Sequence, residues 1–332
     1  LGVSCEPTQG TQDSVSLPPV ETVELPPTFE SVGPESYVSK VKNLLTGLGP
    51  TDAELQAVRA DEQALTGLID EWMKTPQFQA RTLRFFSTAF QQGQLNRASL
   101  IEMAPDAPIS ERMLGNIQSS FPLTVWQLAV VEGKPFTEAL TTERFMMTAP
   151  LATLLSFMDN RHTSDQNRGT DYITSTNPTF KFTLSNKSGP IPIEKTLDPQ
   201  DPLFMNFYLP AAPPPACIDP LTYNRDTPRL YQFLFGTVVA SQGVCLQSFV
   251  TPSQFADAEY DTWRMVTVRQ PKPGEPATLF YDLKTMRTGG ELVLRVPRVG
   301  FFSTPAFFAN WATNTSNLAR VTVNQTLIVA LG

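Results

Sequence analysis

Proline is unevenly distributed along this chain, and its distribution limits which segments can form regular structure. Ten of the thirty prolines fall within residues 190–228, and three of them are consecutive at Pro213, Pro214 and Pro215. Each proline fixes its own φ angle and lacks a backbone N–H, so this density forbids regular helix and favours extended, polyproline-like loops. The sequence therefore predicts a loop-rich insertion over residues 161–298.

Short strands are expected inside this insertion. Its β-branched and aromatic runs are separated by turn residues, and the Gly289–Gly290 pair is typical of a turn before the last run. The expected strands cover residues 180–184, 231–239, 263–268, 278–281 and 292–296. We therefore expect a small β-sheet within the insertion.

Residues 37–160 carry helical periodicity. Thr51 and Glu54 have the spacing of a capping box, and Pro76 stands where a first helical turn tolerates proline. The apolar stripe that follows the helical repeat is Leu65, Leu68, Ile69, Trp72 and Met73. Later helices are expected over residues 110–120, 123–132, 135–142 and 150–158. The predicted fold class is mainly α, a helical bundle interrupted by the insertion.

The C-terminal segment, residues 299–332, returns to helix. Pro305 is expected to start a short aromatic helix, and Ser316 or Thr315 is expected to cap a final one. The apolar face of that final helix comprises Leu318, Val321, Leu327, Ile328 and Leu331. We expect this face to pack back on the bundle.

The N-terminal segment, residues 1–36, is rich in proline, serine, threonine and glutamate. It contains six acidic residues and no lysine or arginine, whereas the whole chain has a formal net charge of −7. Such a segment buries too little apolar surface to offset its ordering entropy, which predicts a flexible acidic tether or a strap around a neighbour. The rest of the chain is then nearly neutral, which argues against nucleic-acid binding.

Three cysteines are present, Cys5, Cys217 and Cys245. A disulfide between Cys217 and Cys245 would close a loop of about 29 residues and stabilise the fold by roughly 3–4 kcal/mol. Two buried free thiols are the alternative. Cys5 is then left for an intermolecular bond or a lipid. The residues from Leu1 to Cys5 resemble the end of a lipoprotein signal, although lipoprotein cleavage would have removed the first four.

Oxygen-bearing side chains alternate around a glycine at Asp165, Asn167 and Asp171, as in calcium-binding loops. The usual glycine spacing and the distal bidentate glutamate are missing. A calcium site and a polar surface loop are therefore both retained as hypotheses.

His162 is the only histidine, which excludes metal sites with two or three histidine ligands. It is interpreted as a structural or solvent-facing residue, or as an axial ligand for haem. The Cys-x-x-Cys-His attachment sequence is absent, so any haem would have to be held by a partner. Met146 and Met147 lie beside Phe145 and are expected in the core.

Three segments resemble one family. They are LTGLGPTDAE at residues 45–54, WMKTPQFQAR at residues 72–81, and the run from Arg298 to Arg320. The resemblance is to helical domains of unknown function in large secreted bacterial proteins that also carry c-type haem segments. Asn317 and Val321 depart from that pattern, where proline and glycine are common. The resemblance implies an extracytoplasmic location: periplasm, outer membrane-associated or cell surface.

The sequence favours a non-catalytic structural or interaction subunit of a larger extracytoplasmic bacterial assembly, and it leaves enzymatic activity open. Its expected partners are other protein subunits of an envelope or electron-transfer complex. One alternative is an accessory of a c-type cytochrome complex. Another is a hydrolase or glycan-binding module, suggested by Trp263, Trp311 and Tyr260 if they are exposed. No apolar run reaches the roughly 18 residues that a membrane span needs.

Overall fold

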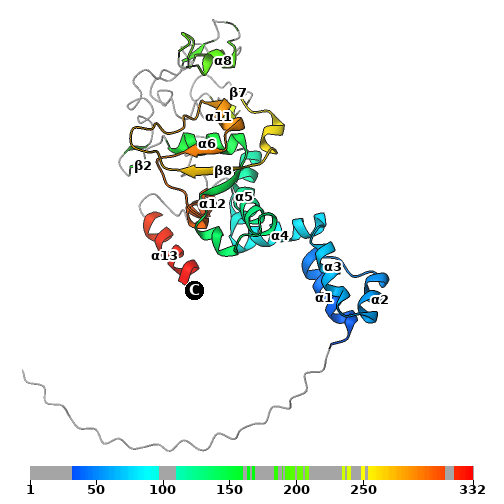
Figure 1. The fold of residues 1–332 in the computed structure, drawn as a ribbon. Coiled ribbons are helices and arrows are strands. Elements are labelled where there is room, and N and C mark those ends of the chain that lie inside the picture. Colours follow the sequence, from blue (N-terminus) through cyan, green and yellow to red (C-terminus); the bar gives the residue numbers. More distant parts are fainter. Residues whose placement is uncertain are drawn as a thin grey trace, which may run out of the picture. The chain divides into compact units, whose positions relative to one another are not determined.

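The computed structural model describes residues 32–96, 110–159, 253–310 and 318–331, with shorter pieces between residues 163 and 250. The fold is mainly α, with one small three-stranded sheet in its core (Figure 1). Two compact units are present. The first contains residues 32–44 and 48–70, and the second contains residues 45–47 and the described residues from 71 onward.

The first unit is helical and is organised around the capping box that the sequence predicts. Its helices are α1 (Pro34–Thr46), α2 (Asp52–Ala60) and most of α3 (Ala64–Trp72). At the start of α2, Thr51 Oγ1 accepts the N–H of Glu54 at 3.3 Å, and Glu54 Oε2 accepts the N–H of Thr51 at 2.6 Å. Lys42 Nζ donates to the same carboxylate at 2.7 Å. Glu54 therefore both caps α2 and ties it to α1.

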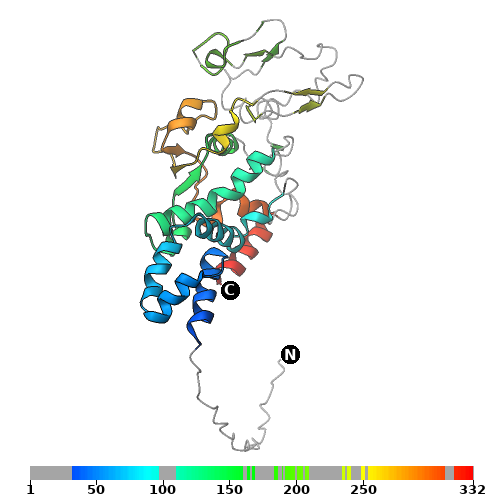
Figure 2. The ribbon, with the colours of Figure 1, turned by 90° about the vertical axis from the view of Figure 1, so that its right-hand side faces the viewer.

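The second unit begins with α4 (Pro76–Ala89), whose first turn contains Pro76 as predicted. This helix ends at Ala89, because Gln91 adopts a left-handed φ of 54° and the 3₁₀ turn η1 (Gln92–Gln94) follows. Next comes α5 (Glu111–Val125), which packs on α4 (Figure 2). A π-helical turn, η3 (Trp126–Val131), extends α5 where a separate helix was expected.

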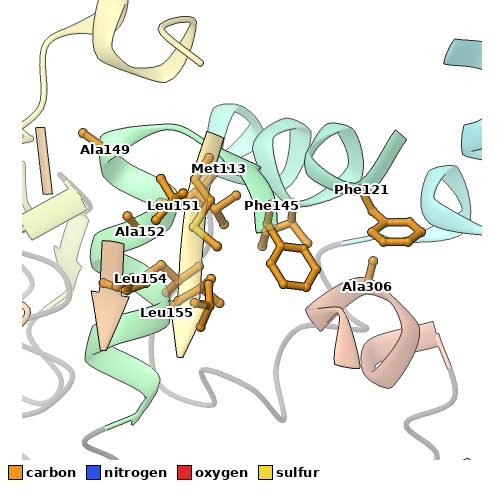
Figure 3. Packing of buried hydrophobic residues seen from close by; sticks show 14 of the residues in the cluster. Met113, Phe121, Phe145, Ala149, Leu151, Ala152, Leu154, Leu155 and Ala306 are labelled. Atoms are coloured by element: carbon orange, nitrogen blue, oxygen red, sulfur yellow. The ribbon is translucent and has the colours of Figure 1, made fainter. Parts of the chain in front are cut away.

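The core of the second unit combines two described stretches that lie far apart in the chain. Helix α6 (Ala149–Asp159) is apolar nearly all round and is buried along most of its length, as such a helix must be. Figure 3 shows Met113, Phe145, Leu151 and Leu154 among the side chains of this core. Residues from 255 to 309 belong to the same cluster. The chain segments 110–159 and 253–310 therefore share one hydrophobic core.

The sheet in this core has the order β1-β8-β9, with β1 (Arg144–Met147), β8 (Arg264–Arg269) and β9 (Glu291–Val293). Strand β1 is antiparallel to β8, and β9 is parallel to β8. The outer edge of β1 bonds to α5: Thr124 Oγ1 accepts the N–H of Met146 at 2.8 Å, and Ser120 Oγ donates to its carbonyl at 2.6 Å. Side chains of a helix thus replace a further strand at this edge.

The strand predicted at residues 263–268 coincides closely with β8, and the one predicted at 292–296 overlaps β9. The four-residue strand β1 was not predicted. The strand predicted at residues 278–281 is wrong, because these residues form no strand. There Thr278 instead exchanges hydrogen bonds with Val293, through its N–H and its hydroxyl. Residues 298–300 lead into the 3₁₀ turn η7 (Phe301–Ser303). Of the two methionines predicted in the core, Met147 is buried, whereas Met146 is only partly buried.

The remaining elements are short, apart from the last helix. The core contains η4 (Phe136–Leu140), η6 (Asp257–Tyr260), α11 (Leu283–Thr288) and α12 (Pro305–Asn310), and the last begins at Pro305 as predicted. The pieces between residues 163 and 250 are β2 (Thr163–Ser164), β3 (Asn167–Arg168), β4 (Thr183–Ser185), α8 (Ile193–Thr196), β5 (Asn206–Tyr208), β6 (Val238–Ala240) and β7 (Ser248–Val250). The chain closes with α13 (Leu318–Leu331).

Candidate functional site

The turn at residues 298–304 is built around Gly300. Gly300 has φ 57° and ψ −162°, a region that is nearly exclusive to glycine. Its N–H donates to the carbonyl of Thr142 at 2.7 Å. A Cβ at this position would lie 2.1 Å from the carbonyl oxygen of Leu140. The backbone of this turn therefore approaches η4 as only glycine allows.

Arg298 is inserted beside this turn. Its Nη1 donates to the carbonyl of Ser303 at 3.0 Å, and its Nε is sealed from solvent without a hydrogen-bond partner in the described part of the chain. Burial lowers the pKa of Arg298 to about 10, and the negative charge of Asp159 opposes that shift. The carboxylate of Asp159 accepts the N–H groups of Arg295 and Val296, at 3.0 and 2.8 Å. Arg298 is thus a charged anchor at neutral pH.

A cavity next to Arg298 has a volume of about 20 Å³. Gln92, Ser120, Phe121 and Met147 are among the residues that line it. This volume is close to that of a single water molecule, so the cavity cannot admit a substrate. The Arg298 turn is therefore a structural anchor of the core rather than a reaction site.

In the part of the chain that the structure describes, two open hollows are large enough for a ligand. The first, of about 530 Å³, is polar, and Thr137, Glu138, Glu143 and Arg144 are among its lining residues. Arg144 donates to both carboxylate oxygens of Glu132 at 2.8 Å, and this bidentate bond lowers the pKa of Glu132. The guanidinium charge in this hollow is thus already satisfied.

The second hollow is a groove of about 610 Å³ between residues in and next to α8 and residues in and next to α11. Its apolar lining residues are Leu197, Leu279, Tyr281 and Leu283, and its charged ones are Glu194, Asp198, Asp282, Lys284 and Arg287. Burial raises the pKa of Tyr281, and the charge of Asp282 adds to the shift, so its phenol stays protonated at neutral pH. The groove combines a hydrophobic floor with a charged rim, which suits ligand binding.

Helix α13 carries an apolar surface that is open to solvent. Val323, Leu327, Ile328 and Leu331 are 59, 52, 52 and 79% exposed. The sequence placed three of these residues on the face that packs on the bundle, and that packing stays a prediction.

Most site residues that the sequence singles out lie outside the described residues. These are Cys5, His162, Asp165, Asp171, Cys217 and Cys245. Asn167 lies in β3, where it pairs with Ser164 of β2, but its side chain is outside the described part. The part of the chain that the structure describes contains no group of three His, Cys, Asp or Glu side chains placed to hold a metal ion. The calcium, disulfide and haem-ligand hypotheses therefore stay predictions.

Two of the three aromatic residues considered for glycan binding are described. Tyr260 is only 4% exposed, and Trp263 packs partly buried against the core, so the expectation of an exposed Tyr260 is wrong. The reason is η6, which turns Tyr260 inward, where its carbonyl accepts Asn116 Nδ2 at 2.8 Å. Trp311 lies outside the described residues.

No family model, curated protein or solved structure matches this chain. The resemblance of its three segments to the secreted, haem-associated domains is therefore an untested prediction. Among the helices described, none is both long enough and apolar enough to cross a membrane.

Proposed function

We propose that this chain is a non-catalytic interaction subunit of an extracytoplasmic bacterial assembly, and that α13 is the element that binds another protein subunit. One observation carries the proposal. Four large aliphatic side chains of α13 are each more than half exposed, within a helix whose only charged residue is Arg320. Contiguous apolar surface of this kind marks interaction sites on soluble proteins.

The energetics favour a covered helix. Burying one leucine or isoleucine side chain fully contributes about 1.5–3 kcal/mol. Leu331 lies one turn after Leu327 and Ile328, at spacings of four and three residues, so a single partner surface can cover all three. Isolated helices of this length are marginal in water, and contact with a partner would stabilise α13 as well.

The test compares the protein isolated in its native assembly with a variant in which α13 is made polar, Leu327→Gln/Leu331→Gln. Glutamine keeps helix propensity while removing apolar surface. Size-exclusion chromatography with light scattering should give a mass above that of one chain for the wild type and a single-chain mass for the variant. A matched control, Leu44→Gln/Leu48→Gln, changes two exposed leucines of the first unit and should preserve the assembly.

The competing expectation is that α13 packs on its own bundle. In that case, Leu327→Gln/Leu331→Gln would lower the free energy of unfolding of the isolated chain by several kcal/mol and leave assembly intact. A single-chain mass for the wild type taken from its native source would contradict the proposal.

A further inference from the structure

The groove between α8 and α11 has walls that are fixed by local contacts. Asp282 caps α11: its carboxylate accepts the N–H of Thr285 at 3.1 Å and the Thr285 hydroxyl at 2.6 Å. On the opposite side, Thr196 Oγ1 donates to the carbonyl of Asn206 at 3.0 Å. Phe204 packs edge-on against Tyr281, with ring centroids 5.3 Å apart. The segment that contains α8 is therefore held against the floor of the groove.

The floor of the groove is apolar and partly open. Leu279 is 40% exposed, whereas Tyr281 and Leu283 are packed into the core beneath it. The volume of about 610 Å³ lies within the range of roughly 300–1,000 Å³ that is typical of binding pockets. An apolar side chain of a ligand would find a hydrophobic surface here.

The rim of the groove is negatively charged. Glu194, Asp198 and Asp282 contribute three carboxylates, and Lys284 and Arg287 contribute cations. Arg287 is already neutralised, because its Nε donates to Glu259 at 2.6 Å and its Nη2 donates to the carbonyl of Gln254 at 3.1 Å. The carboxylates therefore outweigh the remaining charge of Lys284.

We infer that this groove binds a short segment of a partner protein in which lysine or arginine alternates with leucine-like residues. The basic side chains lie among Glu194, Asp198 and Asp282, and the apolar side chains lie on Leu279 and Tyr281. Complementary charge selects the partner, and burial of its apolar residues holds it. The inference rests on the proposed role as an interaction subunit and names the chemistry of a second contact of that subunit.

The polar hollow at Glu138 and Glu143 provides a contrast within the same molecule. It also carries two carboxylates, but its lining is mainly threonine, proline and charged residues rather than leucine and tyrosine. A basic, apolar peptide should therefore distinguish the two hollows, although each offers negative charge.

The experiment uses the full chain and three fluorescein-labelled synthetic peptides. The first has the repeated sequence Lys-Leu, the second Glu-Leu and the third Lys-Ser, all of equal length. Fluorescence anisotropy at about 20 mM and about 300 mM NaCl should show binding of the Lys-Leu peptide that weakens with salt, as screened surface charges require. The Glu-Leu and Lys-Ser peptides should bind at least about tenfold more weakly, because each lacks one of the two contributions.

Two variants locate the binding. Glu194→Gln/Asp198→Asn should weaken the Lys-Leu peptide about tenfold, since each exposed ion pair contributes up to a factor of roughly five. Leu279→Ser should weaken it without changing the salt dependence. The control Glu138→Gln/Glu143→Gln removes the same charge from the polar hollow and should leave binding unchanged. An equal loss in the control would assign binding to net charge and overturn the inference.

Repeating the titration with Leu327→Gln/Leu331→Gln distinguishes binding of the Lys-Leu peptide in the groove from binding on α13. Unchanged affinity in this variant supports the groove, and loss of binding would assign the peptide to α13 and overturn the inference. Equal binding of all three peptides, or of none, would also overturn it. The assembly test of α13 does not use the groove residues, so the two proposals can fail independently.

Discussion

At the scale of single residues, the Arg298 turn shows how one backbone position can determine a contact. Gly300 lies in the core against η4, and its conformation is closed to residues that carry a Cβ. Gly274 also has a left-handed φ, of 81°, but a Cβ there would meet nothing within 4 Å. A substitution at Gly274 therefore tests backbone strain alone, whereas one at Gly300 tests strain together with steric overlap.

Gly300→Ala should lower the free energy of unfolding by about 3 kcal/mol or more, because strain and the clash with Leu140 add together. Gly274→Ala should lower it by only about 1 kcal/mol, the cost of a left-handed conformation alone. Urea unfolding monitored by circular dichroism measures both. Similar losses in the two variants would contradict the close approach at Gly300.

At the scale of elements, Arg269 connects the end of β8 with β9 and the loop between them. It donates to Glu275 at 2.6 Å and to Glu291 at 2.7 Å. The bond to Arg269 lowers the pKa of Glu275 to about 2 and also lowers the pKa of Glu291. A carboxylate with a lowered pKa in the folded state stabilises the fold above its ordinary pKa of 4.5, and this contribution is lost as the pH falls toward 2.

Arg269→Met should therefore flatten the loss of stability between pH 4.5 and about 2, because both carboxylates would lose the largest cause of their lowered pKa in the folded state. The side chains of Arg269, Glu275 and Glu291 are 23, 29 and 51% exposed, so solvent screens part of the effect. Free energies of unfolding measured across this pH range test the expectation. The control is Arg112→Met, whose partner Asp257 is 85% exposed. An equal loss of unfolding free energy between pH 4.5 and about 2 in the wild type and in Arg269→Met would refute the expectation.

At the scale of the whole molecule, the two compact units have separate interiors. Val38 and Val58 are fully buried in the first unit. The main hydrophobic cluster of the described residues runs from Phe86 to Ala309 and includes neither of them. Substitutions in separate hydrophobic interiors are expected to act independently.

Val58→Ala should therefore reduce hydrogen-exchange protection of amides in α1 and α2 and leave α6 unchanged, with a local cost of about 1–3 kcal/mol. Leu154→Ala should do the reverse, at a cost of about 2–5 kcal/mol in the second unit. Hydrogen exchange followed by mass spectrometry resolves the two. Loss of protection in both units from either variant would show that they unfold as one.

The sequence alone predicts features whose causes lie within a few neighbouring residues. The capping box at Thr51 and the helix starts at Pro76 and Pro305 are of this kind, because a side chain or a fixed φ acts on its own first turn. The mainly α fold class follows from the same local periodicity. Candidate sites were harder to predict, since the groove joins residues 194–198 with residues 279–288 and shows no motif in either segment.

Only the tertiary structure decided the contacts between distant segments. It paired β1 with β8, more than a hundred residues later, and so brought residues 253–310 into the core beside α5 and α6. It also buried the Nε of Arg298, brought Gly300 against η4 and turned Tyr260 inward. The physical reason is that such contacts depend on burial and close packing between surfaces that are remote in the chain, and a short strand or a single glycine carries no local signal of its partner.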